Sequence, residues 1–187
     1  MSQADFGRYL ECSLTLAEDL VNTYDPISGE DELTGLPALI DFVRAHEVSN
    51  PGKATTVDVG RVRDLRTKLR SVFDASDQQN AVKILNRLLS ESGARPELTN
   101  HDGEPLHLHY SPPGTPLAPR LTAETAMALT VVIAEDGFDR LRICEGERCE
   151  DVFVDESRNR SRRYCSPAVC GNRASVAAWR ARRRAEH

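Results

Sequence analysis

The sequence predicts an α+β protein with a mainly helical N-terminal domain that includes one short β-hairpin, followed by a small cysteine-rich C-terminal module. Three observations support this prediction. Apolar residues recur at helical spacing through most of the first 92 residues, two short alternating runs flank a turn near Gly103, and four of the five cysteines fall between Cys144 and Cys170. We expect two domains, residues 1–139 and residues 140–187.

The composition is typical of a folded, water-soluble protein, since 40% of the 187 residues are hydrophobic and 28% are charged. Aromatic residues contribute only 5%, so the predicted core consists mostly of Leu, Val, Ile and Ala. The longest apolar run, residues 126–134, is much shorter than the roughly 20 residues needed to cross a bilayer. The N-terminus carries acidic residues and lacks the apolar stretch of a signal peptide. We therefore expect a cytoplasmic protein with no membrane partner.

Four helices are predicted in the first half of the chain from apolar stripes at helical spacing. Pro26 follows the first stripe, Pro37 fits the first turn of the second helix, and a loop at residues 49–52 precedes the third. Asp77 fits the N-cap of the fourth helix, and Gly93 is its stop signal. The stripes are Leu10, Leu14, Ala17 and Val21; Leu36, Leu39, Ile40 and Val43; Val62, Leu65, Leu69, Val72 and Phe73; and Val82, Leu85, Leu88 and Leu89.

The pattern changes at Arg95. Residues 96–99 and 105–110 are predicted to be short strands on either side of a turn at residues 101–104, and the Pro- and Gly-rich residues 111–119 form a loop. An almost entirely apolar helix is then expected over residues 123–134, with Thr122 as its N-cap. Because it is apolar on most sides, we expect this helix to lie in the centre of the domain.

Three histidines near this hairpin, His101, His107 and His109, offer a candidate metal or catalytic site. The simpler interpretation is a strand face exposed to solvent, since no cysteine or organised group of carboxylates accompanies them. The sequence also lacks a G-x-S-x-G, a phosphate-binding loop or an H-E-x-x-H motif. We therefore predict that the protein is not an enzyme. Cys12 lies in an apolar-periodic stretch and is expected to be a small buried residue.

The four remaining cysteines form two matched pairs, Cys144-x4-Cys149 and Cys165-x4-Cys170, separated by fifteen residues. Thiols of a cytosolic protein stay reduced, so clustered cysteines there bind metal more often than they form disulfides. Two pairs of thiolates supply the tetrahedral sulfur set that Zn²⁺ takes in structural sites. We predict one structural zinc ion held by all four, with no position left open for catalysis.

The segment around the cysteines predicts a treble-clef type of finger. Gly146 lets the first pair fold around the ion, residues 151–155 and 162–164 are expected to form a hairpin, and a helix is expected over residues 171–184. Trp179 is predicted to pack against this hairpin. A module of 48 residues has too few apolar residues to be stable alone, so its folding should depend on the metal.

The net charge of −5 hides a strong asymmetry. Residues 140–187 contain twelve Arg, no Lys and seven acidic residues, which leaves a net charge of −10 for the first 139 residues. From Ser157 to the end, nine Arg face only Glu186. Guanidinium groups make bidentate contacts with phosphate, so an anionic partner is expected for this end of the chain.

Cys170-Gly171-Asn172-Arg173 and the preceding string from Phe153 to Ser166 resemble the CGNR zinc-finger family. Leu20-Val21-Asn22-Thr23 and the overall length are similar, more loosely, to the ABATE domain that usually precedes this finger. The family consists of bacterial proteins regarded as stress-induced transcription regulators. The resemblance implies a treble-clef finger that binds double-stranded DNA, attached to a domain with a sensory role that offers a site for a small-molecule effector or for homodimerisation.

The candidate DNA contacts divide into two roles. Most of the arginines are expected to contact phosphates, which fixes position without reading sequence. Asn172 and Arg173 start the last helix and could reach base edges, although Asn172 could instead cap the helix or support the metal site. The full set is Arg158, Arg160, Arg162, Arg163, Asn172, Arg173, Arg180, Arg182, Arg183 and Arg184. The alternative function is a zinc-stabilised module that binds a protein partner and no DNA.

Overall fold

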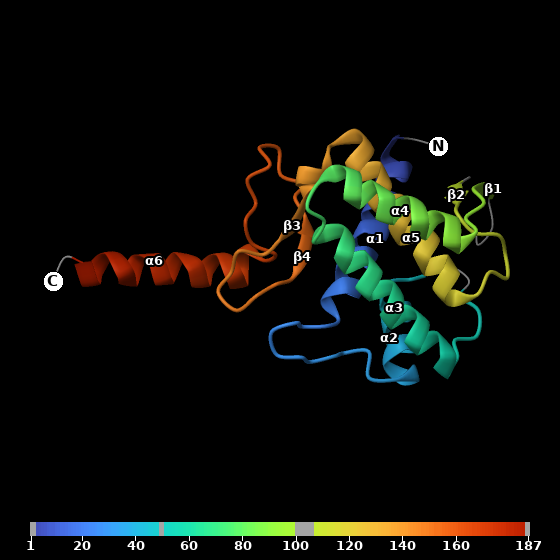
Figure 1. The fold of residues 1–187 in the computed structure, drawn as a ribbon, viewed down its shortest axis with the longest axis horizontal. Helices are drawn as coiled ribbons and strands as arrows, with labels where there is room; N and C mark the ends of the chain where they lie inside the picture. The colour runs from blue at the N-terminus through green and yellow to red at the C-terminus, as the bar shows by residue number, and fades with distance from the viewer. Residues whose placement is uncertain (1–2, 49–50, 100–106, 186–187) are drawn as a thin grey trace.

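The computed structural model describes residues 3–48, 51–99 and 107–185 (Figure 1). The body contains helices α1 (Gln3–Asn22), α2 (Leu36–Ala45), α3 (Thr56–Phe73), α4 (Gln78–Ser92) and α5 (Leu117–Glu135), with strands β1 (Glu97–Thr99) and β2 (His107–His109). The C-terminal part contains the 3₁₀ turn η1 (Phe138–Arg140), strands β3 (Leu141–Ile143) and β4 (Val152–Val154), the π-helical turn η2 (Pro167–Gly171) and helix α6 (Asn172–Ala185). The α+β class predicted from the sequence is confirmed.

Helix α5 is the centre of the body and contacts α1, α3 and α4. Leu121, Ala126 and Leu129 on this helix are fully buried, as its apolar composition predicts. It is also the described helix long and apolar enough to span a membrane, but 67% of the relevant window is buried inside the protein. The helix begins at Leu117, five residues earlier than the predicted cap at Thr122, because Pro116 and Pro119 fall at its cap and in its first turn, where a missing backbone N–H costs no helical hydrogen bond. That prediction was wrong.

The predicted ends of the other helices are largely confirmed. The Asp77 carboxylate accepts a hydrogen bond from the Asn80 amide at 2.9 Å, and Gly93 ends α4 in the left-handed conformation with φ 65°. Pro37 lies in the first turn of α2.

On α1, Cys12 is exposed, so the prediction that it is buried was wrong. The core-facing stripe of α1 runs through Ser13, Leu14 and Ala17 and leaves Cys12 on the solvent side.

The predicted hairpin in the body is confirmed as the antiparallel pair β1–β2, in which Leu98 lies opposite Leu108. The prediction that the histidine side of this hairpin faces solvent was wrong for His109, which is only 5% exposed. Leu98 is instead 64% exposed. The protein therefore covers the His109 side of β2 rather than leaving it to solvent. His101 and the side chain of His107 lie outside the described residues.

The second hairpin differs from the prediction. Val152–Val154 is a strand, but it pairs with Leu141–Ile143 and not with residues 162–164. The first cysteine pair therefore occupies the connection of this hairpin, and residues 155–164 form a loop. Leu141 and Val154 pair in register and join the hydrophobic core of the body, whereas Phe153 faces the cysteines. The hairpin is thus shared between the body and the cysteine-rich end.

Candidate functional site

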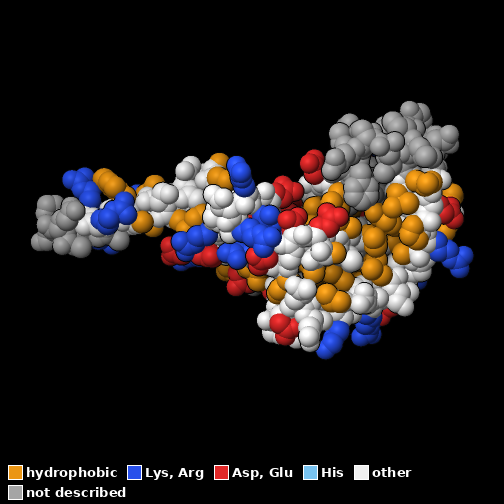
Figure 2. Space-filling model, turned by 90° about the horizontal axis from the view of Figure 1, so that it is seen from above, with side chains coloured by type: hydrophobic (Ala, Val, Ile, Leu, Met, Phe, Trp, Pro, Cys, Tyr) orange, Lys and Arg blue, Asp and Glu red, His pale blue; other side chains and the backbone are white. Residues whose placement is uncertain are grey.

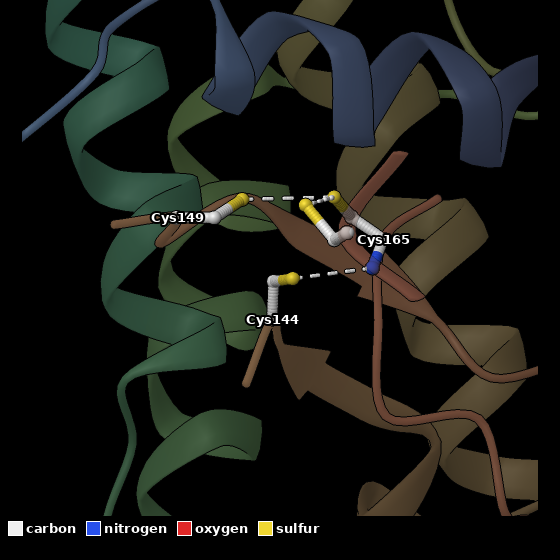
Figure 3. Close-up of side chains that lie close together, drawn as sticks. Cys144, Cys149 and Cys165 are labelled. Carbon is white, nitrogen blue, oxygen red and sulfur yellow. Dashed lines mark hydrogen bonds between the residues drawn. The ribbon is translucent and has the colours of Figure 1, made fainter. Parts of the chain in front are cut away.

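Four cysteine sulfurs lie together at the end of the β3–β4 hairpin (Figure 3). Four sulfurs bound tetrahedrally at ~2.3 Å from one ion lie about 3.8 Å from one another. The Sγ of Cys165 is 3.7 Å from that of Cys149 and 3.7 Å from that of Cys170, and all four sulfurs fall within 4.8 Å of one another. With Cys144 they form a group that can hold one metal ion, and the part of the chain that the structure describes contains no second such group.

The local sequence explains how the cysteines converge. Cys144 directly follows β3, and the connection to Cys149 turns back tightly at Gly146, whose carbonyl accepts from the Cys149 amide at 3.2 Å. A β-carbon at Gly146 would lie 3.2 Å from the Cys144 sulfur and 3.3 Å from that of Cys170, so a side chain there would crowd the centre. Cys170 lies in η2, which begins where Ser166 accepts from the Val169 amide. Each pair therefore comes from one tight turn.

Backbone amides and burial set the charge of the thiols. Burial raises the pKa of Cys144, but hydrogen bonds from the amides of Cys165 and Gly146, both 3.4 Å from its sulfur, outweigh burial and lower it. Burial raises the pKa of Cys149 to about 12 and that of Cys165 well above its usual range. Four thiolates can therefore be assembled here only around a cation, so metal binding releases protons.

Asp151 adds a carboxylate beside the centre, which sequence reasoning missed. Its Oδ2 lies 3.2 Å from the Cys165 sulfur, a hydrogen bond that requires the protonated thiol. When Cys165 is a thiolate on a metal, the two negative groups repel each other and the carboxylate must turn away. The position of Asp151, two residues after Cys149, was visible in the sequence, but its approach to Cys165 depends on the loop that returns to the hairpin.

Side chains of α1 bind the outer edge of β4. The Asn22 amide group donates to the Val152 carbonyl at 3.0 Å and accepts from the Val152 amide at 2.8 Å. One turn earlier, Glu18 accepts from the Val154 amide at 2.8 Å. We call this contact the α1–β4 seam. It joins residues 130 or more positions apart and fixes the hairpin on the body.

The seam contains a partly buried carboxyl group, that of Glu18. Burial raises the pKa of Glu18 to about 7, although the hydrogen bond from Val154 and the charge of Arg162 act in the opposite direction. From α3, Arg70 donates to the Glu150 carbonyl at 2.6 Å, which adds a second attachment between the body and the cysteine turn. The base of the cysteine-rich end is therefore held from two helices.

Three of the predicted phosphate contacts in the loop of residues 155–164 are bonded within the chain. Arg160 pairs with Asp139 at 3.0 Å, and Arg163 pairs with Glu145, with Nε at 2.7 Å from the carboxylate. Arg162 lies over the Phe153 ring, 4.6 Å from its centroid, and donates to the carbonyls of Tyr164 and Cys165. These contacts order the loop around the cysteines.

The remaining predicted arginines are on the surface, away from these acidic groups. Arg158 is exposed in the loop, and no carboxylate of the described residues lies within salt-bridge distance of it or of the arginines on α6. Those on α6 are Arg173, Arg180, Arg182, Arg183 and Arg184, all of them exposed. Helix α6 extends away from the body (Figure 1), and Figure 2 shows Lys and Arg side chains along it and at its base.

The structure also shows the surroundings of Trp179 and Asn172, two further residues of α6. Trp179 is 50% exposed, with Arg183 5.1 Å from its ring centroid, so the prediction that it packs against a hairpin was wrong. The reason is that α6 contacts η2 and then extends away from the hairpin.

The Asn172 side chain donates to the Ala168 carbonyl at 2.9 Å, which ties the start of α6 to η2. This bond favours the structural interpretation of Asn172.

The geometry defines a helical body joined through a β-hairpin to a group of four cysteines that can hold a metal ion, followed by an arginine-rich helix. Residues 140–183 match the family described as the CGNR zinc finger. Residues 14–139 match the family described as "Putative stress-induced transcription regulator", the ABATE domain. That second match covers more than half of the sequence, and the chain therefore belongs to this family, with both parts in the order that the sequence motifs predict. Neither description names an enzymatic activity. No curated protein matches the sequence significantly.

Proposed function

We propose that this protein is a cytoplasmic, DNA-binding transcription regulator. In this proposal Cys144, Cys149, Cys165 and Cys170 hold one structural Zn²⁺, α6 contacts double-stranded DNA, and the body has a sensing or dimerisation role. Four thiolates form the donor set that Zn²⁺ takes in structural sites, and the family match to a zinc finger supports this metal. The treble-clef description of the finger remains part of the proposal.

The observation that carries the proposal is the charge and position of α6. Over its 14 residues the helix has five Arg and no acidic residue, and it projects beyond the acidic body (Figure 1). A helix of this length is about 21 Å long and fits the roughly 12 Å wide major groove of B-DNA. Exposed guanidinium groups without internal ion pairs keep their full charge for phosphates.

Within this interface we assign different roles to the arginines. Arg180, Arg182, Arg183 and Arg184 contact phosphates, with Arg158 from the neighbouring loop. Arg173, at the start of the helix, is the candidate for a base contact, since Arg binds the acceptors of guanine. Arg160, Arg162 and Arg163 act first by ordering the loop, because the first and third form ion pairs and Arg162 donates to backbone carbonyls.

The test is the salt dependence of DNA binding, measured by fluorescence anisotropy with metal-loaded, full-length protein. Each phosphate contact contributes about 0.9 to the slope of log K against log salt concentration, so five arginines give a slope of about −4.5. The double variant Arg180→Gln/Arg184→Gln should flatten the slope by about two units. Arg44→Gln/Arg87→Gln removes the same charge from exposed positions on the body and should leave the slope unchanged.

A second candidate function rests on a specific observation. Val176 and Trp179 on α6 are 46% and 50% exposed, and apolar side chains of this size on an isolated helix also suit a protein groove with an acidic rim. If no duplex binds even at low salt, or if both double variants weaken DNA binding equally, the proposal of DNA binding fails. The protein-binding function then becomes the better one.

A further inference from the structure

The body contains a cavity of about 800 Å³ at the start of α5, where the loop of residues 111–116 faces the segment that leads into α3. Chain order places this cavity at one end of α5 and the finger after the other end. The cavity shares no residue with the metal centre or with α6. It is large enough for a small organic molecule.

The two helices that begin at this cavity differ in how their N-termini are satisfied. At α3, the Asp58 carboxylate accepts from the Thr55 amide at 2.9 Å and from the Thr55 hydroxyl at 2.7 Å, so an acidic group of the protein already lies there. At α5, the preceding residue is Pro116, no side chain caps the helix, and the first turn has no acidic residue. The positive end of the α5 dipole therefore lacks a negative partner from its own helix.

A buried hydroxyl group provides a second and independent observation. Ser111 lines the cavity and is 4% exposed, and its Oγ has no hydrogen-bond partner among the described residues. A buried polar atom without a partner destabilises a protein, and so it is an indicator of a missing ligand. The hydroxyl can donate one hydrogen bond to an acceptor in the cavity.

The charge and the apolar surface of the lining indicate the chemical class of a ligand that could provide this acceptor. Lys53 and Arg61 supply positive charge. Of the two carboxylates in the lining, Asp58 is bonded to Thr55 and Glu97 is exposed on β1. The rest of the lining is largely apolar, with Pro51, Pro113, Pro116 and Leu117. A carboxylate attached to an apolar group complements both parts.

We infer that this cavity binds a small organic carboxylate, with the carboxylate at Ser111 and the start of α5 and the apolar part against the prolines. The inference deepens the proposed sensing role of the body and depends on that role only for the biological consequence of binding. Binding itself is measured without DNA, so a failure here and a failure of the proposed DNA binding are separate results.

The experiment uses benzoate as the probe and isothermal titration calorimetry with metal-loaded, full-length protein. Benzoate should bind at least about tenfold more tightly than benzyl alcohol, its neutral analogue, because a hydrogen bond to a charged group contributes about this factor. Ser111→Ala should weaken benzoate binding about tenfold and should not lower the melting temperature, because the hydroxyl has no internal bond to lose. Arg61→Gln should also weaken binding, whereas Arg87→Gln on α4 should not.

Several results would overturn the inference. Equal affinity for benzoate and benzyl alcohol would remove the requirement for a negative charge. Inorganic phosphate that binds as well as benzoate, with the same dependence on Ser111, would show that the apolar wall has no role. A lower melting temperature for Ser111→Ala with unchanged benzoate binding would assign Oγ to the fold instead.

Discussion

The hairpin β3–β4 and helix α6 belong to the same finger, but the protein holds them in different ways. Leu141, Val152 and Val154 of the hairpin lie in the core of the body, and the α1–β4 seam bonds its outer edge. Helix α6 contacts η2, and its apolar residues Val176 and Trp179 stay exposed. The finger is thus part of the body at one end and outside it at the other.

This difference predicts a structural role for a metal ion bound by the four cysteines. Cys144 and Cys149 come from the hairpin connection, while Cys165 and Cys170 precede α6. The small cluster around Cys144, Phe153 and Cys170 has little apolar surface of its own. A metal bound by all four cysteines would therefore link the fixed hairpin to the projecting helix, in addition to the ion pair of Arg163 with Glu145.

The largest expected effect is the loss of the metal. Cys170→Ser should reduce the metal content, measured by elemental analysis, from about one ion per chain to well below one, since structural Zn²⁺ contributes ~10 kcal/mol or more to such modules. Hydrogen exchange should then show loss of protection in η2 and at the start of α6, because Cys170 in η2 attaches this helix to the metal. The hairpin strands should keep most of their protection. Cys12→Ser, at an exposed position on α1, is the matched control and should change nothing.

If β3–β4 loses protection together with α6 in Cys170→Ser, the hairpin depends on the metal as much as the helix does. The comparison would then be wrong, and the 140–183 segment would be one unit of folding.

The next effect concerns the partly buried carboxyl of Glu18 in the seam and its pH dependence. The pKa of Glu18 is about 7 in the folded protein, above its ordinary value of 4.5. The folded state therefore binds more protons than the unfolded state between these values, and stability falls as pH rises from about 4.5 to 7. Glu18→Gln keeps an acceptor for the Val154 amide and removes the charge. It should increase the free energy of unfolding at pH 8 by roughly 3 kcal/mol at most, with little effect near pH 4.5.

Urea denaturation at the two pH values measures this difference. Glu11→Gln, at an exposed position on the same helix, provides the control. A stability gain that is equal at both pH values would exclude the charge of Glu18 as its cause.

A somewhat smaller effect is expected for the other residue of the seam. Asn22→Ala removes two hydrogen bonds to Val152 and leaves its buried backbone groups without these partners, which should cost about 1–3 kcal/mol in the free energy of unfolding. Asn86→Ala on the exposed face of α4 should be nearly neutral in the same denaturation experiment. Equal effects of the two variants would mean that the seam does not hold the hairpin.

The smallest expected effect is a difference in the salt dependence of DNA binding between arginines with and without an ion pair in the protein. Arg180→Gln should flatten the salt dependence of DNA binding by about 0.9. Arg160→Gln should change it less, because Asp139 already neutralises that charge. Anisotropy titrations over the same salt range compare the two. A larger change from Arg160→Gln would place the loop, and not α6, at the centre of the DNA contact.

The features that the sequence predicted well are those with local causes. The two x4-spaced cysteine pairs each close one turn, and Asp77 and Gly93 bound α4 through contacts within a few residues. Local patterns of this kind depend little on the rest of the fold, so the four sulfurs could be identified before their positions were known.

The features that were missed depend on distant partners. The strand at Val152–Val154 was recognised, but its partner was sought downstream, although Leu141 and Ile143 alternate in the same way on the other side of the cysteine turn. The contacts of Asn22 and Glu18 with β4 span 130 or more residues and have no signal in one sequence. Similarly, nothing local to Arg160 indicates that Asp139 neutralises it. The seam and the division among the arginines therefore required the structure.

The projection of α6 also has a consequence for evolution. Most substitutions at exposed helix positions change stability by less than about 0.5 kcal/mol, whereas changes in a packed core cost several times more. Substitutions on the exposed face of α6 should therefore have little effect on the stability of the protein. Selection can alter the charge and shape of this helix, and so its preferred target, while the body that supports it stays the same.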